Sequence, residues 1–157
     1  LKDWPVCTLG LSVYEAHEVY DSTTCGFELA YQFPFNVLDR RFCSVEMLTG
    51  KRYARSIFLQ GLLAYGGLPQ PDMNSELRNI GAKYHAILSD NGWNPINFAL
   101  SFANNSENID YMVVGVECVG QLEEIISLEL YDAMITSNVN FDQTIPYGKW
   151  IDPRQWS

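Results

Sequence analysis

Short apolar segments alternate with amphipathic ones along this chain. The apolar segments are rich enough in β-branched and aromatic residues to be strands, and the third breaks into a loop near Gln60-Gly61. The four predicted strands cover residues 6–14, 27–35, 52–63 and 109–116. Helices are predicted over 15–23, 75–90, from 95 onward and from 119 onward, with a helical turn or two within 40–48. Strands that alternate with helices indicate an α/β fold of parallel β–α units, whose strands are covered on both faces.

Three of these helices show a recurring apolar face. In the segment 75–90, apolar residues follow the i, i+3, i+4 spacing of an amphipathic helix. Asn94-Pro95 is a favourable N-cap and first-turn pair for the next helix. The residues predicted to face inward are Leu77, Ile80, Tyr84 and Leu88, then Ile96, Ala99, Leu100 and Ala103, and finally Val119, Leu122, Ile125 and Ile126.

Composition narrows the class of protein. A chain of 157 residues that is 47% hydrophobic is expected to form one globular domain. No apolar run approaches the roughly 18 residues of a membrane span, and the first residues lack the order of a secretory signal. With 19 acidic residues against 10 basic ones, the chain lacks the basic surface that nucleic-acid binding requires.

The four cysteines, Cys7, Cys25, Cys43 and Cys118, stand far apart in the sequence. No C-x-x-C pair and no nearby pair of histidines accompanies them, so we expect no metal site. Four cysteines would permit disulfides in a secreted protein, but a chain with a core of this size does not need them. We therefore expect reduced thiols in a cytoplasmic protein.

The segment "MVVGVECVGQLEEII" (112–126) runs an apolar strand into Gly115, a short loop and a helix. In parallel α/β folds, ligands gather at the carboxyl ends of the strands. The start of the helix near Val119 offers unpaired backbone N–H groups to an anion, and Gly115 and Gly120 allow a ligand to approach the backbone. The same arrangement is also an ordinary β–α turn, so this pattern alone leaves both interpretations open.

Four colinear segments resemble a known family. "LGLSVYEAHEV", "AYQFPFNVLDRRF", "YARSIFLQGLL" and "FALSFANNSENIDYMVVGVECVGQLEEI" are similar to consecutive segments of aldo-keto reductases, in the bacterial branch with an R-S-x-F-L-Q-G segment. The closing "IDPRQW" is similar to the tail of that branch. The resemblance runs from about residue 1 to 156. It implies that residues 1–157 form a single domain corresponding to strands 5–8 and the tail of a (β/α)₈ barrel. The family binds NADP or NAD and transfers hydride to or from a carbonyl, so the implied partners are a nicotinamide dinucleotide and a small carbonyl or sugar substrate.

The resemblance also implies positions for the cofactor. Ser12 and Gln32 match the residues that hold the nicotinamide carboxamide, although Val13 stands where the family commonly has Asn. Arg55 occupies the place where many members stack an aromatic ring on the nicotinamide, and an Arg plane can also stack. The remaining matches are Ser56, Phe58, Gln60 and Gly61 for the pyrophosphate, Gly115 for the glycine of the family's P-G-A-R turn, and Gln121 and Glu124 for the adenosine end.

Glu117 departs from the family pattern, because many relatives carry Arg there, facing the 2′-phosphate of NADP. A carboxylate repels that phosphate and can accept a hydrogen bond from a ribose 2′-hydroxyl. Glu117 therefore favours NAD over NADP.

The catalytic Asp, Tyr, Lys and His of the family lie on its first four strands, which have no counterpart here. His17 and His85 are expected to be surface or satisfied helix residues, and Tyr14, Tyr31, Tyr53 and Lys51 fall at the wrong strands. Without a proton donor, the isolated chain is expected to be inactive.

Four strands also leave two open edges, which a missing half-barrel or self-association would cover. The alternatives are a non-catalytic half-barrel that serves as a nucleotide-binding or protein-interaction module, and an unrelated α/β domain.

Overall fold

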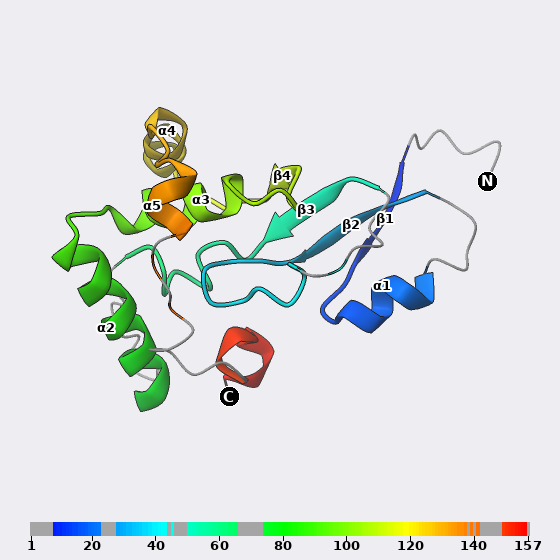
Figure 1. Cartoon of the computed structure of the whole chain (residues 1–157), viewed down its shortest axis with the longest axis horizontal. Coiled ribbons are helices and arrows are strands. Elements are labelled where there is room, and N and C mark those ends of the chain that lie inside the picture. Colours follow the sequence, from blue (N-terminus) through cyan, green and yellow to red (C-terminus); the bar gives the residue numbers. More distant parts are fainter. Residues whose placement is uncertain are drawn as a thin grey trace.

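A computed structural model of the chain describes residues 8–22, 28–43, 45, 50–65, 74–137, 139, 141 and 149–156. Its centre is a four-stranded parallel sheet with the strand order β1-β2-β3-β4 (Figure 1). The strands are β1 (Leu9–Ser12), β2 (Leu29–Pro34), β3 (Arg52–Arg55) and β4 (Tyr111–Met112). The prediction of an α/β fold built from parallel β–α units is confirmed, with β1 and β4 as the edges of the sheet.

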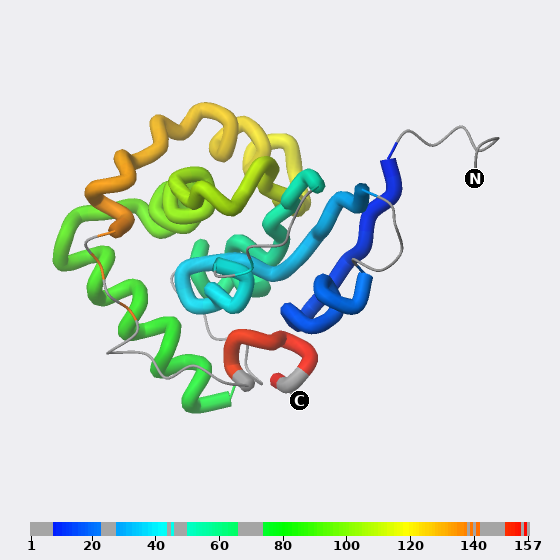
Figure 2. Tube along the Cα trace, turned by 45° about the vertical axis from the view of Figure 1, so that its right-hand side comes forward, coloured from blue at the N-terminus to red at the C-terminus, as the bar shows by residue number. Residues whose placement is uncertain are grey.

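Helices follow and separate the strands. They are α1 (Ala16–Ser22), α2 (Ser75–Asp90), α3 (Pro95–Asn104), α4 (Val119–Ser127) and α5 (Ala133–Ser137), with the 3₁₀ turns η2 (Lys149–Ile151) and η3 (Pro153–Gln155). Asn74 and Asn94 cap α2 and α3 by accepting hydrogen bonds from the backbone N–H groups of Glu76 and Asn97. Figure 2 shows α4 and α5 on the opposite side of the molecule from α1. Within the described ranges, none of the helices combines the length and hydropathy that crossing a bilayer requires.

The register of the sheet brings the carboxyl ends of the strands to one edge. Ser12 pairs with Gln32, Pro34 with Arg55. One residue before the end of β3, Ala54 pairs with Met112. Because all four strands run in the same direction, the segments that follow them emerge side by side at this edge. This edge is where both cavities described below are found.

The core lies on both sides of this edge in two clusters of buried side chains. One cluster surrounds the sheet and contains Phe33, whose ring stacks on Phe42 with centroids 4.5 Å apart. The other lies beneath α2 and α3, where Tyr84 packs against Phe98 and Phe141. Burial raises the pKa of the Tyr84 hydroxyl. The inward faces predicted for α2 and α3 are confirmed, since their predicted apolar residues are all buried.

The predicted strands are longer than those observed. The third ends at Arg55, before the predicted break into a loop near Gln60-Gly61, because residues 57–64 form turns. The fourth strand is paired with β3 only at Tyr111–Met112. The N–H of Val113 still donates to the carbonyl of Ala54, and the chain then leaves the sheet. The first strand is not buried as predicted: Leu9 and Leu11 are 40% and 38% exposed. It is an edge strand, and among the described residues nothing pairs with its outer side.

The inner stripe predicted for α4 is largely exposed. Val119, Leu122 and Ile126, which we call the α4 stripe, are 70%, 45% and 72% exposed. Only Ile125 of the predicted set packs against the core, and it is partly buried. The periodicity predicts one apolar face of α4, but no described element covers the α4 stripe.

Two other predictions concern segments that are only partly described. The helical turn expected within 40–48 is seen as a turn over 41–43, while residues 44 and 46–49 lie outside the described residues. Cys43 and Cys118 are exposed, and Cys118 is a free thiol. Cys7 and Cys25 lie outside the described residues.

An ion pair fixes the start of β4 against β3. The Asp110 carboxylate accepts hydrogen bonds from the backbone N–H of Arg52 at 2.8 Å and from its Nε at 3.1 Å. These bonds lower the pKa of Asp110. The pair anchors the last strand before the segment that forms one wall of the larger cavity.

We expect Asp110→Asn to make the free energy of unfolding fall less steeply as the pH is lowered. A carboxylate whose pKa is lowered in the folded state contributes stability above its unfolded pKa, about 3.9, and loses this contribution as pH falls through the folded value. Urea unfolding between pH 6 and pH 2 measures the profile. The variant should lose less stability than the wild type below about pH 4, whereas Asp90→Asn, at the exposed end of α2, should follow the wild type. Identical profiles for Asp110→Asn and the wild type would contradict the role of this pair.

Candidate functional site

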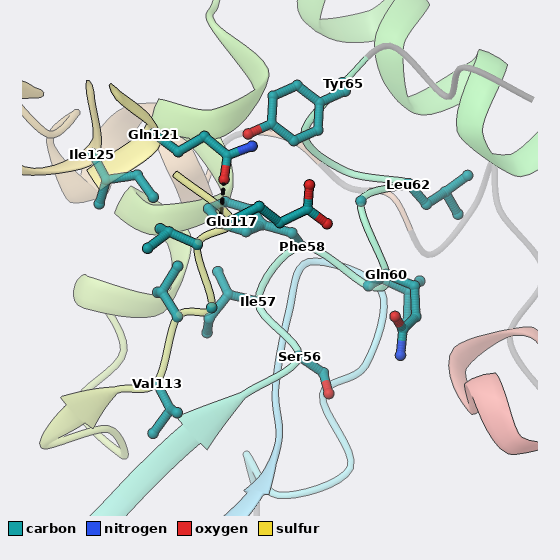
Figure 3. A pocket seen from close by; sticks show the side chains of 15 residues that line it. Ser56, Ile57, Phe58, Gln60, Leu62, Tyr65, Val113, Glu117, Gln121 and Ile125 are labelled. Carbon is teal, nitrogen blue, oxygen red and sulfur yellow. Dashed lines mark hydrogen bonds between the residues drawn. The ribbon is translucent and has the colours of Figure 1, made fainter. Parts of the chain in front are cut away.

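A cavity of about 830 Å³ lies between the loop after β3 and the segment that joins β4 to α4 (Figure 3). Among the predicted cofactor residues, the cavity is lined by Ser56, Phe58, Gln60 and Gly61 from the first segment and by Gly115, Glu117 and Gln121 from the second. These residues are separated by more than fifty positions in sequence, and the parallel pairing of β3 with β4 brings them together.

The loop after β3 has an unusual backbone that is held by its apolar side chains. Ser56, Leu59 and Gln60 have φ values of 59°, 44° and 55°, in the left-handed region that costs energy for residues other than glycine. Leu59 is buried, and the side chain of Asn36 donates a hydrogen bond to the Ser56 carbonyl at 3.1 Å. These contacts hold the loop in one conformation, with Gln60 left exposed at the cavity.

The opposite wall offers backbone groups and one carboxylate. A Cβ on Gly115 would meet nothing within 4 Å, so a ligand can lie directly against the chain there. Gln121 accepts a hydrogen bond from the N–H of Glu117 at 2.7 Å, which fixes the turn into α4. The N-cap residue Cys118 makes no side-chain capping bond, so the first N–H groups of α4 remain open to a ligand.

Glu117 is the one charged residue among the described lining residues of this cavity. Figure 3 shows its carboxylate directed into the space between Phe58, Leu62 and Tyr65. The cavity therefore combines apolar walls, open backbone N–H groups and a single negative charge.

A second cavity, of about 220 Å³, adjoins the first, since Ser56 and Gln60 line both. Its walls come from the loop after β1, the ends of β2 and β3, Arg41 and the C-terminal turns. Its other lining residues are Tyr14, Pro34, Arg41, Arg55, Ile151, Asp152, Pro153 and Arg154. Here the predicted residue Arg55 lies with its guanidinium over the Tyr14 ring, 4.0 Å from the centroid.

The loop after β1 is fixed by Glu18. Its carboxylate accepts hydrogen bonds from the backbone N–H groups of Tyr14 at 2.6 Å and Glu15 at 2.8 Å. These two bonds lower the pKa of Glu18, the one from Glu15 most. The Tyr14 ring is thereby placed at the mouth of the second cavity.

The remaining predicted residues lie outside both cavities. Ser12 ends β1 and is paired with Gln32, two residues before the end of β2. The Ser12 hydroxyl donates to Gln32 Oε1 at 3.3 Å, so the structure brings these two together. Glu124 is exposed on α4 and lines neither cavity.

The histidines are surface or satisfied residues, as predicted. His17 is exposed on α1, and His85 Nε2 lies 2.8 Å from the Leu62 carbonyl oxygen. Lys51 precedes β3, and Tyr53 lies within β3, where it is paired with Gln32. None of these four residues lines a cavity.

Some lining residues were not identified from the sequence. Tyr65 presents a ring that is 47% exposed to the larger cavity, and Arg41 and Arg154 line the smaller one. The sequence placed Arg41 and Arg154 only within the segments "LDRRF" and "IDPRQW". Their spacing along the chain gives no sign that they meet.

Comparisons with known proteins agree with this architecture. No protein-family model matches the sequence, and no curated protein sequence matches it. Among solved structures, the holo and apo forms of an aldo-keto reductase from Bacillus halodurans are similar, each with a TM-score of 0.64 and 14% identity over 83% of this chain and 48% of theirs. A glycerol dehydrogenase of Gluconobacter oxydans is similar with a TM-score of 0.59 and 16% identity, over 93% of this chain and 51% of its own.

The chain therefore spans about half the length of the solved structures it matches. The resemblance to aldo-keto reductases is confirmed at the level of the fold, and the fold is that of a partial barrel. At these identities the similarity concerns the fold, and function has to be argued from the site.

We expect Gly61→Ala to destabilise the loop after β3 by about 1–2 kcal/mol. A Cβ on Gly61 would meet nothing within 4 Å, so the cost comes from its φ of +83° and not from a clash. Gly115→Ala is the matched control, because its Cβ is equally free of contacts and its φ is not in the positive region. Urea unfolding of both variants measures the difference, and equal stabilities would contradict it.

Proposed function

We propose that this chain is the cofactor-holding portion of an aldo-keto reductase-like oxidoreductase, which binds a nicotinamide dinucleotide for hydride transfer between the cofactor and a carbonyl or alcohol. The observation that carries the proposal is the larger cavity, in which cofactor residues predicted from two distant segments meet. The fold shared with aldo-keto reductases supports it. The exposed free thiol of Cys118 is compatible with a cytoplasmic location.

The larger cavity suits the adenosine and pyrophosphate end. Open N–H groups at the start of α4 can donate to phosphate oxygens, and the bare backbone at Gly115 permits the close approach that a pyrophosphate needs. The exposed ring of Tyr65 offers a face on which an adenine can stack. Ser56 and Gln60 continue this surface toward the ends of β1 and β2.

The nicotinamide end is assigned to the carboxyl ends of β1, β2 and β3. Ser12 and Gln32 are already within hydrogen-bonding distance of each other, so one carboxamide can contact both. Arg55 lies on the neighbouring strand β3, where its guanidinium plane can stack on the ring.

Hydride transfer requires a further catalytic group besides these cofactor residues. Hydride transfer to a carbonyl needs a proton donor beside the reacting oxygen. Of the described residues, neither histidine lines a cavity, and neither do Lys51 and Tyr53. Tyr14 lines the smaller cavity, but it follows β1 and does not match the strand that carries the family's catalytic tyrosine. We therefore expect the isolated chain to bind cofactor without turnover, and the acid to come from a completing half-barrel.

The exposed α4 stripe and the exposed edge strand β1 support the hypothesis that a partner completes the barrel. Apolar side chains on one face of an amphipathic helix are normally buried, and here they are solvent-exposed. The missing half-barrel would cover this face, and self-association is the alternative cover. The same exposed face also favours the second candidate function, a non-catalytic half-barrel that acts as a nucleotide-binding or protein-interaction module.

We expect the chain to bind NADH more tightly than NADPH, because the Glu117 carboxylate repels a 2′-phosphate. Glu117→Gln should tighten NADPH binding by several-fold to about tenfold, as one repulsive pair near the surface is removed, and should change NADH binding little. Glu123→Gln, on the exposed surface of α4 outside the cavity, is the control. Fluorescence titration measures all three proteins. Failure of NADH to bind either the chain or the completed barrel would overturn the cofactor assignment.

We expect the α4 stripe to drive association. Sedimentation velocity at increasing concentration should show the wild type forming species larger than a monomer, and Val119→Ser/Ile126→Ser should shift the distribution toward the monomer. Glu123→Gln again serves as the control on the same helix. A wild type that stays monomeric at all concentrations would show that this face does not need self-association to be covered.

A further inference from the structure

The smaller cavity concentrates positive charge in an acidic protein. The chain has a formal net charge of −9 and 10 basic residues, and three of these, Arg41, Arg55 and Arg154, line this one cavity. The larger cavity has no basic residue among its described lining residues. The two neighbouring cavities therefore differ in charge.

Two of the three guanidinium groups already have carboxylate partners. Arg41 donates from Nε and Nη2 to buried Asp39 at 2.9 and 2.8 Å, and from Nη1 to Glu15 at 2.8 Å. Arg154 binds Asp152 through Nε and Nη2, with a shortest contact of 2.6 Å. These pairs position both guanidinium groups at the cavity and balance their charges.

Arg55 differs from the other two. Within the described part of the chain no carboxylate lies within 4 Å of it. Its hydrogen bonds go to neutral acceptors and are long, 3.3 Å to the Val13 carbonyl and 3.4 Å to Ser56 Oγ. Arg55 and Arg154 also lie over the same Tyr14 ring, at 4.0 and 3.5 Å from its centroid. Since Asp152 already balances the charge of Arg154, an anion beside Arg55 would balance the remaining positive charge.

We propose that the cavity beside Arg55 binds the anionic group of a small molecule, a carboxylate or a phosphate ester. Resting on the proposed function, this group belongs to the carbonyl substrate, so the enzyme acts on an anionic carbonyl compound. The volume of about 220 Å³ holds such a group, since a water molecule occupies about 30 Å³. Pro34, Ile151 and Pro153 supply apolar walls that strengthen a charge-assisted hydrogen bond.

The location fits a substrate subsite. The cavity shares Ser56 and Gln60 with the larger one, so a cofactor in the larger cavity and an anion in the smaller one would be neighbours. A guanidinium stacks through its plane and donates hydrogen bonds from its edge, so Arg55 can contact a nicotinamide and an anion at the same time.

The wild-type chain provides the first test. Titration with inorganic phosphate and, separately, with acetate is followed by the arginine side-chain Nε–H resonances in NMR. The Arg55 resonance should shift and saturate, and the resonance of Arg78, on α2 away from the cavity, should not. A response to phosphate alone or to acetate alone identifies the class of anion. No saturable response at Arg55 to either anion would overturn the proposal.

Variants test the same residue independently. Arg55→Gln should weaken anion binding by at least about tenfold, the loss expected for a charge-assisted hydrogen bond. Arg55→Lys should retain part of the affinity, because it keeps the charge but loses the planar fork. Arg78→Gln should bind like the wild type. Circular dichroism checks folding, and the wild-type resonances decide the question if Arg55→Gln does not fold. Unchanged affinity in a folded Arg55→Gln would overturn the proposal.

Repeating the phosphate titration with saturating NADH separates this inference from the proposed function. Simultaneous binding supports a substrate subsite. Displacement of phosphate by NADH would mean that the cofactor's own pyrophosphate occupies the cavity, and would overturn the substrate assignment. Phosphate binding at Arg55 in a chain that never binds NADH, alone or completed, would support the anion site while overturning the proposed function.

Discussion

The hydrogen-bonded ladder between parallel strands is the constraint on which the site depends. It fixes Ser12 beside Gln32 and Pro34 beside Arg55, and it brings the loops after β3 and β4 to the same edge. None of these residues is close to its partner in sequence. A shift of one strand by one residue would turn its side chains to the opposite face of the sheet and would separate these groups. The ion pair between Arg52 and Asp110 reinforces the pairing where the ladder is shortest.

The two cavities at this edge of the sheet are lined by different polar groups. The larger one has open backbone N–H groups and the Glu117 carboxylate, whereas the smaller one has three guanidinium groups and one carboxylate, that of Asp152. Their common boundary is the loop after β3, in which residues with positive φ are held by buried leucines. A loop of this kind keeps its shape without a ligand, so a ligand would bind without a large loss of conformational entropy in the loop.

The sequence predicted best what local interactions decide. The ends of α2 were predicted correctly, and α3 begins at the predicted capping pair, because Asn74 and Asn94 cap the helices themselves. The apolar run 52–63 predicts a strand that lasts until the loop near Gln60-Gly61, whereas β3 ends at Arg55, because apolar residues that anchor a turn look the same in sequence as those of a strand. Periodicity identified the apolar face of α4, but it could not show whether anything covers it.

The candidate site was predicted through the family resemblance. Seven of the cofactor residues that the resemblance implies lie together in the larger cavity. The sequence did not predict the smaller cavity, because its lining residues come from four segments that are distant along the chain.

The contact between Tyr14 and Arg154 joins the first described strand's loop to the last described turn. Nearly the whole described chain lies between these two residues, so closing this contact requires a large loop and is expected late in folding. The larger cavity needs only residues 56–125 and their support. During synthesis on a ribosome, the wall that carries Arg154 would be made after both walls of the larger cavity. The larger cavity would therefore take shape before the smaller cavity beside it is closed.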